Sequence, residues 1–514
     1  MTRVRLLAAA ACCALLAAAA PLRAQGRDAV LRAIHEEGMQ RSALEPLAQA
    51  LLDSIGPRLT GSPGQAAAHR WAEGVLAGWG VAARSEPYGR WEGWERGVTH
   101  VDLLEPRVRT LEARLLAWSR GTDGPVTGGV VHLPDPGDAA AFQAWLAGAR
   151  GKWVLMSPTP ATCRPIENWQ RWAQPQTLAR LAAEVAAADT AFARRVRGTR
   201  MSGQRLAMAL GAAGVAGLLT TDWTGGWGTE FVHAAWPGLV MLSVGCEDFG
   251  LLARLAERRQ GPVIRVDARV RSTGLAPAMN TVGEIRGRAL PGEYVVLSAH
   301  FDSRDAASGA TDNGSGALVM MEAMRILRQV YPRPNRTLLV GHWSGEEQGL
   351  NGSRAFAEDH PDVVGGIQAL LNQDTGTGRI DRISLQGFTG AGAFLRRWLA
   401  RVPAELADGI ALDDPGLPSA GSSDHSSFVC RGAPGLWLLS TSWDYGTYTW
   451  HTNRDTYDKL VFADLRRNAV LLAMLAYLAA EDPERVPRTR RELPANPQTG
   501  APGTWPRCLP AERG

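Results

Sequence analysis

The second half of the chain contains apolar segments that are followed directly by polar residues. In the segment YVVLSAHFDS, a run of mostly apolar residues ends in His300 and Asp302. Similar polar residues follow later apolar segments or lie in a Gly-rich loop, namely Asp312, Glu346, Glu347, Asp374 and His451. Histidine nitrogens and carboxylate oxygens are common ligands of zinc-like ions. The pattern therefore predicts a metal site that is assembled from residues far apart in the sequence.

From about residue 280 onward, segments with strand and helix patterns alternate. Strands are expected near 294–300, 336–343, 366–374 and 432–440, and helices near 316–330, 352–358 and 462–480. This alternation is typical of an α/β sheet. In open α/β sheets, ligand sites lie beyond the carboxyl ends of the strands. We therefore expect the candidate ligands to meet at one edge of one sheet.

The first 280 residues are organised differently. Helices are expected over about 27–54 and 64–76, followed by strands over 98–118. Between 121 and 272, short strand-like segments alternate with Gly- and Pro-rich turns, and an Ala/Arg-rich helix is expected near 176–198. We predict that 25–120 and 273–481 form the main domain, that 121–272 is an inserted module, and that 482–514 is a Pro/Arg-rich tail.

The candidate ligands suffice for two metal ions that share one carboxylate. Two-metal hydrolase sites hold their ions about 3.5–4 Å apart. Asp312 is the natural bridge, together with a shared water. His300 and Asp374 would complete the site of one ion, and Glu347 and His451 that of the other. Mixed histidine and carboxylate ligation favours zinc, although cobalt or manganese could substitute in vitro.

Three further residues have candidate roles in a reaction at this site. Glu346 and Glu347 are adjacent and cannot both point at one ion from a regular element, so Glu346 is free to act as a general base. Asp302 could orient His300 through the other ring nitrogen. His425, in the expected loop GSSDHSSF, could donate a hydrogen bond to a developing oxyanion. A purely structural loop histidine is the equal alternative.

The N-terminal residues predict export. Arg3 and Arg5 precede a short apolar segment from Leu6 to Ala20, and small residues follow, which predicts a signal peptide at 1–24 with cleavage after Ala24. An uncleaved anchor is the alternative, but the segment is too short for a comfortable membrane span and no second one is long enough. We therefore expect a secreted or periplasmic protein with no stable membrane span.

The cysteines predict disulfides, and the net charge bears on the binding partners. Beyond the predicted signal peptide lie Cys163, Cys246, Cys430 and Cys508. An oxidising compartment favours one or two disulfides, and three pairings are open. The net charge is +4, and no Lys/Arg block has the character of a nucleic-acid surface, so no nucleic-acid partner is predicted.

The motifs of the second half resemble those of the M28 metallopeptidase family. That family shows an HxD motif, a D-[DN]-x-[SG]-G loop, an EE pair, an NxD motif and a late HT. In this chain they stand at 300–302, 312–316, 346–347, 372–374 and 451–452. In the first part, DSIGPRLTGSPG, WERG and LLEPR resemble the carboxypeptidase Q group of the family. The resemblance implies a three-layer α/β domain with a mixed sheet, of the phosphorylase/hydrolase-like type, with a protease-associated (PA) domain inserted at 121–272.

The same resemblance implies an activity. It implies two zinc ions, bridged by Asp312 and a water or hydroxide, a dipeptide or short-peptide substrate, and a homodimer. We therefore predict a metallo-exopeptidase with Glu346 as base. The loops GSSDHSSF and YTWHTNRDT depart from the carboxypeptidase Q pattern, so dipeptidase and aminopeptidase both stay open. The alternatives are a glutaminyl cyclase-like acyl transferase, a non-catalytic binding protein of the same fold, and an insert that binds a partner.

Overall fold

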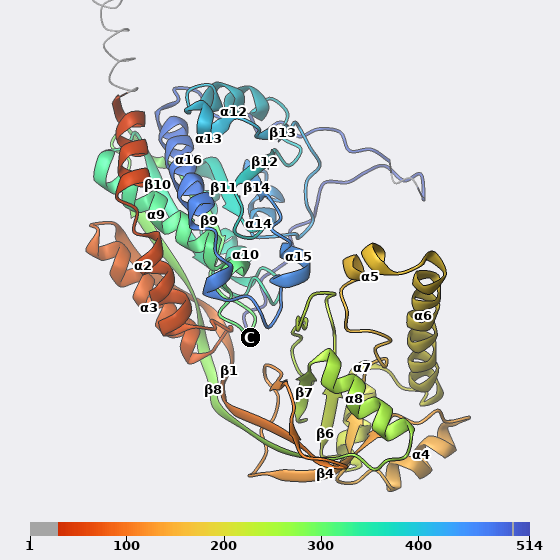
Figure 1. Cartoon of the computed structure of the whole chain (residues 1–514). Coiled ribbons are helices and arrows are strands. Elements are labelled where there is room, and N and C mark those ends of the chain that lie inside the picture. Colours follow the sequence, from red (N-terminus) through yellow and green to blue (C-terminus); the bar gives the residue numbers. More distant parts are fainter. Residues whose placement is uncertain (1–28, 496–497) are drawn as a thin grey trace, which may run out of the picture.

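The chain forms two units that are joined by a long pair of strands (Figure 1). The structure is a computed structural model that describes residues 29–495 and 498–514. The predicted signal peptide at 1–24 lies outside these residues. Within them, no helix combines the length and the apolar character of a membrane span.

A mixed sheet forms the centre of the larger unit. Its strand order is β13-β12-β14-β11-β9-β10-β8. The strands are β8 (Val263–Ile285), β9 (Leu290–His300), β10 (Arg336–Trp343), β11 (Ile367–Gln373), β12 (Ile380–Ser384), β13 (Ala411–Asp413) and β14 (Gly435–Ser440). The central strands β14, β11, β9 and β10 run parallel. Strand β8 pairs antiparallel with β10, and β12 pairs antiparallel with β14.

Helices cover both faces of this sheet. Successive side chains of a strand point to opposite faces, and in β9 Val295 and Leu297 join one apolar cluster while Val296 joins another. The first face packs against α3 (Pro63–Gly78), α9 (Ser315–Val330), α12 (Ala391–Leu399) and α16 (Phe462–Glu481). The second packs against α10 (Asn351–Asp359), α11 (Pro361–Gly366) and α14 (His425–Val429). The predicted three-layer α/β fold is therefore confirmed.

The N-terminal helical region is less continuous than its pattern predicts. A helix over 29–40 is followed by α2 (Leu44–Ala48) and a π-helical segment, η1 (Gln49–Ile55). Pro46 explains the interruption, because a proline is tolerated in the first turn of a helix but not in its interior. The next helix, α3, is N-capped by Ser62, whose hydroxyl accepts a hydrogen bond from the backbone of Gln65.

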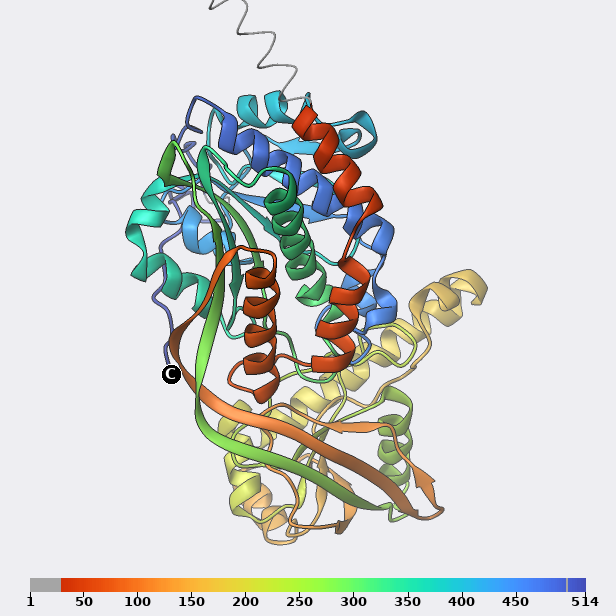
Figure 2. The same cartoon turned by 90° about the vertical axis from the view of Figure 1, so that its left-hand side faces the viewer.

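A two-stranded ribbon leads from the larger to the smaller unit. Strand β1 (Ala82–Glu105) pairs antiparallel with β8 along almost its whole length, and the two strands curve together between the units (Figure 2). The strands expected over 98–118 thus begin earlier, at Ala82. Both strands belong to both units.

The smaller unit is built between the two ends of this ribbon. Its strands are β2 (Arg109–Thr110), β3 (Ala113–Leu115), β4 (Val126–His132), β5 (Trp153–Leu155), β6 (Gly217–Thr220) and β7 (Met241–Val244). Its helices are α4 (Ala139–Ala147), α5 (Ile166–Trp172), α6 (Pro175–Gly198), α7 (Gly203–Ala212) and α8 (Cys246–Glu257). The helix expected near 176–198 is α6. Strand β3 belongs to the sheet of this unit although it precedes the predicted start of the insert at 121.

Two disulfides join the four cysteines. Cys163 pairs with Cys246 in the smaller unit, and Cys430 pairs with Cys508. The second bond fixes the C-terminal segment to the end of α14. Arg513 adds ion pairs with Glu358 and Asp359 of α10. The end of the Pro/Arg-rich tail predicted at 482–514 therefore lies against the larger unit.

Candidate metal centre

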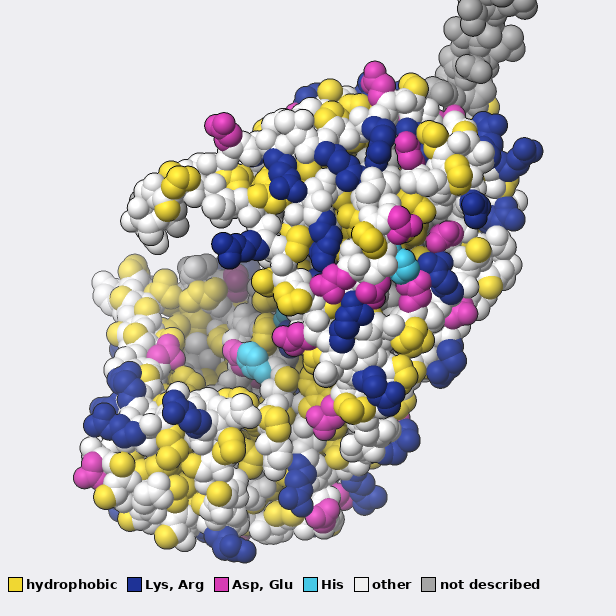
Figure 3. Space-filling model, turned by 180° about the vertical axis from the view of Figure 1, so that it is seen from behind, with side chains coloured by type: hydrophobic (Ala, Val, Ile, Leu, Met, Phe, Trp, Pro, Cys, Tyr) yellow, Lys and Arg dark blue, Asp and Glu magenta, His cyan; other side chains and the backbone are white. Residues whose placement is uncertain are grey.

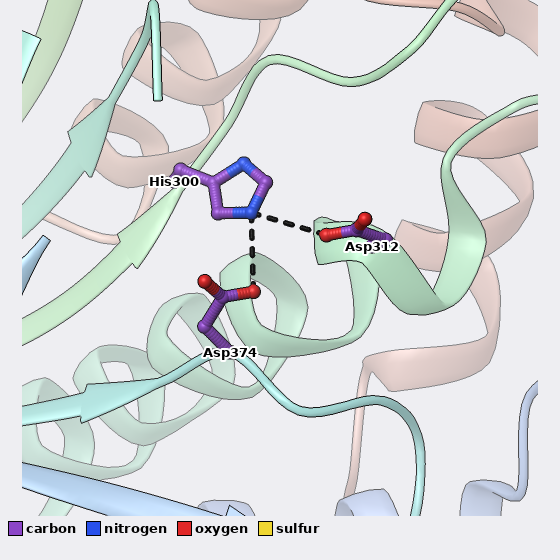
Figure 4. Close-up of side chains that lie close together, drawn as sticks. All are labelled: His300, Asp312 and Asp374. Carbon is purple, nitrogen blue, oxygen red and sulfur yellow. Dashed lines mark hydrogen bonds and ion pairs between the residues drawn. The ribbon is translucent and has the colours of Figure 1, made fainter. Parts of the chain in front are cut away.

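His300, Asp312 and Asp374 lie together at the carboxyl edge of the sheet (Figure 4), and we call them the first triad. His300 is the last residue of β9, and Asp374 directly follows β11. The Nε2 atom of His300 lies 3.2 Å from Oδ1 of Asp312 and 3.1 Å from Oδ1 of Asp374. The His300 side chain is only 1% exposed. The strand-end rule thus brings His300 and Asp374 together as expected, and the loop before α9 adds Asp312.

The other ring nitrogen of His300 is held by the backbone. Nδ1 lies 3.1 Å from the carbonyl oxygen of Asp302, and a carbonyl can only accept, so Nδ1 carries the proton. Nε2 is left to face the carboxylates. We expected Asp302 to orient this ring; its backbone carbonyl makes the contact, while its carboxylate is 3.6 Å away. The carboxylate instead accepts hydrogen bonds from the backbone of Glu346 and Glu347, at 3.2 Å each.

Asp312, Glu347 and His451 form a second group of candidate ligands, which we call the second triad. Nε2 of His451 lies 3.0 Å from Oε2 of Glu347 and 3.2 Å from Oδ2 of Asp312. Glu347 lies in the turn after β10, and His451 in the loop after α15 (Tyr445–Tyr448). His451 has a φ of 56°, a left-handed conformation that is uncommon for a residue with a Cβ.

Asp312 belongs to both triads through different oxygen atoms. Oδ1 faces His300, and Oδ2 faces His451. The loop that carries Asp312 is held by Asp455, whose carboxylate accepts hydrogen bonds from the backbone N–H groups of Thr311 and Asp312 at 2.7 and 3.0 Å. A carboxylate with its oxygens directed to two ligand sets is the arrangement that a bridging ligand requires.

The electrostatics of both triads favour cations. Burial alone would lower the pKa of His300, but the carboxylates of Asp374 and Glu346 outweigh it and raise this pKa well above its usual value. Burial also opposes protonation of His451, yet Asp312 and Glu347 raise its pKa to about 9. Burial would raise the pKa of Asp312, but its hydrogen bonds with the two histidines lower it below the usual range. These carboxylates therefore attract positive charge into the site.

Glu346 differs from its neighbour Glu347 in its surroundings. Its carboxylate is partly accessible and makes no hydrogen bond within the described part of the chain. Burial, followed by the nearby charges of Asp374, Asp424 and Glu347, raises its pKa well above the usual value, although His300 opposes the rise. A carboxyl group with a raised pKa, next to a site for cations, has the properties of a general base.

His425 lies in a different environment from the one we expected. It begins the short helix α14 rather than lying in a loop, it is fully buried, and its ring stacks on Trp437 with centroids 5.2 Å apart. Burial lowers its pKa to about 3. Among the described residues, no hydrogen bond or ion pair links it to either triad, so its oxyanion role stays a prediction. The preceding Asp424 is the residue whose charge reaches His300 and Glu346.

Two arginines near the site were not singled out from the sequence. Arg58 is fully buried and donates hydrogen bonds to the backbone carbonyls of Phe301, Ser308 and Gly309, at 2.7, 2.6 and 2.8 Å. It thereby holds the loop before Asp312. Arg304 donates a hydrogen bond from Nε to Oε2 of Glu347 at 2.7 Å. Arg58 lies in the DSIGPRLTGSPG segment and Arg304 two residues after Asp302, but neither position follows a periodic pattern that would mark it.

The smaller unit contacts the second triad directly. The backbone of Val232 donates a hydrogen bond to the carbonyl of His451 at 2.8 Å, and the ring of Phe231 lies 5.2 Å from that of His451. Asn453 accepts a hydrogen bond from the backbone of Glu230 at 2.7 Å and returns one from its own backbone at 3.1 Å. The sequence had marked no residue of the smaller unit as part of the site.

The donor atoms of the two triads fit metal ions. In each triad, one ligand atom per residue lies within 4.8 Å of the others. Oε1 of Glu347 is buried without a hydrogen-bond partner, and a role of this oxygen as a metal ligand would explain that. One nitrogen and two carboxylates in one triad, and the same set in the other, suit zinc.

Comparisons with known proteins show which sequences this chain resembles. Residues 280–476 match the model of peptidase family M28. Carboxypeptidase Q from Homo sapiens is 25% identical over 459 residues, and the match covers 89% of each chain. Leucine aminopeptidase 1 from Ajellomyces dermatitidis is 32% identical over 199 residues, covering 36% of this chain and 52% of that protein.

Solved structures share the fold. A peptidase M28 precursor from Shewanella amazonensis has a TM-score of 0.64 at 20% identity, covering 92% of this chain and 100% of that one. A zinc aminopeptidase from Bacillus subtilis has a TM-score of 0.55 at 17% identity, covering 85% and 94%. The chain is therefore similar to the M28 metallopeptidases, by a sequence match over residues 280–476 and by relatives at 25% identity that span most of its length.

Proposed function

We propose that this protein is an exported dizinc exopeptidase that hydrolyses dipeptides or removes the N-terminal residue of short peptides. The observation that carries the proposal is the position of Asp312, with Oδ1 towards His300 and Oδ2 towards His451. The first and second triads would each hold one zinc ion, with Asp312 as the shared ligand. When bound, zinc supplies Lewis-acid polarisation of a peptide carbonyl and lowers the pKa of water.

The residues around the triads have distinct tasks in this proposal. Glu346 accepts the proton of the attacking water and passes it to the leaving amine nitrogen. Asp302 positions Glu346, because its carboxylate accepts the backbone N–H groups of both glutamates. His300 would hold the first ion through the lone pair of Nε2, because Nδ1 donates to the carbonyl of Asp302. Glu346 alone therefore accounts for both proton transfers of the reaction, and no further acid or base is needed.

We propose that the smaller unit is a PA-like insert that limits the size of the substrate. The molecule is hollowed between the two units when seen from behind (Figure 3). Phe231 of the smaller unit and Trp450 of the larger unit both pack against the ring of His451, with centroids 5.2 and 4.2 Å away. A unit in direct contact with a ligand loop leaves little room for a long polypeptide.

Export and assembly complete the proposal. The two disulfides fit an extracellular protein, and the predicted signal peptide at 1–24 would direct it there. We also propose a homodimer, which sedimentation of the purified mature protein would test; a single monomeric species at micromolar concentration would refute it.

The test of function is release of free amino acids by the purified protein, with and without a chelator and added zinc. The substrates are dipeptides, N-blocked dipeptides and aminoacyl-anilides. Chelator-sensitive cleavage of free dipeptides alone supports a dipeptidase, and cleavage of anilides supports an aminopeptidase. No hydrolysis despite two bound zinc ions would refute the proposal and favour cyclase chemistry or a binding role.

Glu346→Ala separates the base from the ligands. We expect this variant to keep both zinc ions, measured by plasma mass spectrometry, and to lose turnover by about 10²–10⁴-fold. Loss of zinc together with activity would show that Glu346 is a ligand and not a base.

A further inference from the structure

Arg304 presents unused hydrogen-bond donors beside the second triad. Its Nε donates to Oε2 of Glu347 at 2.7 Å. Within the part of the chain that the structure describes, its terminal nitrogens make no hydrogen bond, and the side chain is 27% exposed. A guanidinium carries five N–H donors in a planar fork, so most of the donors of Arg304 remain free for a ligand.

The backbone around Arg304 is fixed on both sides. The preceding Ser303 accepts a hydrogen bond from the backbone of the buried Arg58 at 3.1 Å. The following Asp305 forms a two-point ion pair with Arg96 of β1, at 3.0 Å from Nε and 2.6 Å from Nη2. Arg304 is therefore held in place by its neighbours and by Glu347, unlike an ordinary surface arginine. Such restraint lowers the entropy cost of binding a ligand.

Arg304 gives the site two chemically different ends. It lines the small cavity at the second triad, together with Asp312, Glu347 and His451. Arg304 forms an ion pair with Glu347. Among the described residues, no other arginine forms an ion pair with a member of either triad. The other end, at Asp374, carries a carboxylate and no arginine among the ion pairs of the described residues. A substrate with an amine at one end and a carboxylate at the other matches this polarity.

We propose that Arg304 binds the C-terminal carboxylate of the substrate, which makes unblocked dipeptides the preferred substrate class. The inference rests on the proposed exopeptidase function. Arginine binds carboxylates through paired N–H donors, which gives both charge and geometry. In a dipeptide the carboxylate is one residue beyond the scissile bond, and each added residue moves it by about 3.3–3.6 Å. A longer peptide cannot place its carboxylate on the same arginine without a bend.

The alternative is that Arg304 acts only on Glu347, by orienting that carboxylate. The two roles differ in what they do to substrates that lack the carboxylate. A carboxylate anchor affects free dipeptides and spares their C-terminal amides. A residue that acts through Glu347 affects both substrates equally and changes zinc content.

The test compares one dipeptide with its C-terminal amide in the full-length mature protein. We expect the wild type to prefer the acid. In Arg304→Gln, kcat/KM for the acid should fall about 10- to 100-fold, mainly through KM, while the amide changes less than about twofold and zinc content is unchanged. Arg304→Lys should recover part of the loss. Arg271→Gln, which removes an exposed arginine paired with Glu95, is the control and should leave the ratio of acid to amide as in the wild type.

A binding measurement keeps this inference separate from the proposed function. In the Glu346→Gln background with zinc, calorimetry should show tighter binding of the dipeptide than of its amide, and Arg304→Gln should abolish the difference. If the wild type hydrolyses neither compound, the proposed function fails while this comparison still decides the role of Arg304. Equal binding of acid and amide, or equal loss for both on Arg304→Gln, would overturn the inference.

Discussion

The two triads share Asp312 but are held by different parts of the molecule. The first draws His300 from the end of β9 and Asp374 from the end of β11, two neighbouring parallel strands in the middle of the sheet. The second draws Glu347 from a turn and His451 from a loop that touches the smaller unit. His300 is 1% exposed and His451 12%. The sheet therefore fixes the positions of His300 and Asp374 in the first triad, whereas the position of His451 in the second depends on a contact between the units.

The largest expected effect comes from removing one histidine from each triad. His300→Ala and His451→Ala should each lower kcat/KM by at least about a thousandfold, because under the proposed function each removes a ligand of an ion that the reaction requires. We expect His451→Ala to retain about one zinc ion per chain, held by the first triad. Plasma mass spectrometry and kinetic assays check both variants. Retention of two ions by His451→Ala would contradict the division into two triads.

Arg58 should be essential to the stability of the loop that both triads share. Arg58→Met leaves several buried carbonyls without their donor and removes a charge that nearby carboxylates favour, so we expect a loss of about 3–5 kcal/mol in the free energy of unfolding. Chemical denaturation measures it. Arg336→Met is the matched control: Arg336 is also buried and binds the carbonyls of Ala479 and Ala480 at the far end of β10. It should destabilise the fold without weakening zinc binding in the folded protein, whereas Arg58→Met should do both.

Glu230 should make the stability of the smaller unit sensitive to pH, because its carboxylate is bound by residues of that unit. Burial raises its pKa to about 7, although hydrogen bonds from Asp222, Thr221 and Cys246 limit the rise. A carboxyl group whose pKa is raised on folding binds more protons in the folded state, so its contribution to stability falls as pH rises from the unfolded value of 4.5 to about 7. The expected size is about 3 kcal/mol.

The change in stability between pH 4.5 and 7, measured for the wild type and Glu230→Gln, checks this. The difference in free energy of unfolding between the two proteins should shift in favour of the variant as pH rises. A constant difference over this range would show that folding does not raise the pKa of Glu230.

Asn453 should affect both zinc binding and stability. Asn453→Ala removes the hydrogen bonds of its side chain with Glu230 and Gly228, at 2.7 and 3.0 Å, and we expect a loss of about 1–2 kcal/mol. Affinity for one of the two zinc ions should fall about 10-fold. The control is Asn468→Ala, which removes two hydrogen bonds of similar length, with Ile380 and Gly378, away from the triads. If both variants weaken zinc binding equally, the second triad does not depend on the smaller unit.

The difference between the triads also explains what the sequence could predict. Apolar strands of the larger unit were recognised because each is a continuous run of buried residues, and parallel strands bring their carboxyl ends to one edge. That rule alone placed His300 and Asp374. The short strands β12 and β13 and the helix α12 were not predicted, because their burial depends on neighbours that the local sequence does not specify.

Contacts between distant loops carry no local pattern. The hydrogen bonds of Glu230 with Asn453, and of Arg58 with the carbonyls before Asp312, join segments more than 200 residues apart. Both disulfide pairings arise in the same way from the final arrangement. His425 differs from these residues: its motif suggested a chemical role, the structure buries its ring against Trp437, and its part in the reaction stays a prediction.

The two units are joined by a hydrogen-bonded ladder and not by flexible linkers. Strands β1 and β8 pair through both units, with irregularities in register near Gly89, Trp94 and Thr99. Bulges are where paired strands bend, so the angle between the units can change there only by bending or twisting the ribbon. Replacing the smaller unit with that of a relative would therefore require the register between β1 and β8 to be kept in both strands where the replacement joins the ribbon. A graft displaced by one residue would turn every ribbon side chain to the opposite face, and would move the loop at Phe231 away from His451.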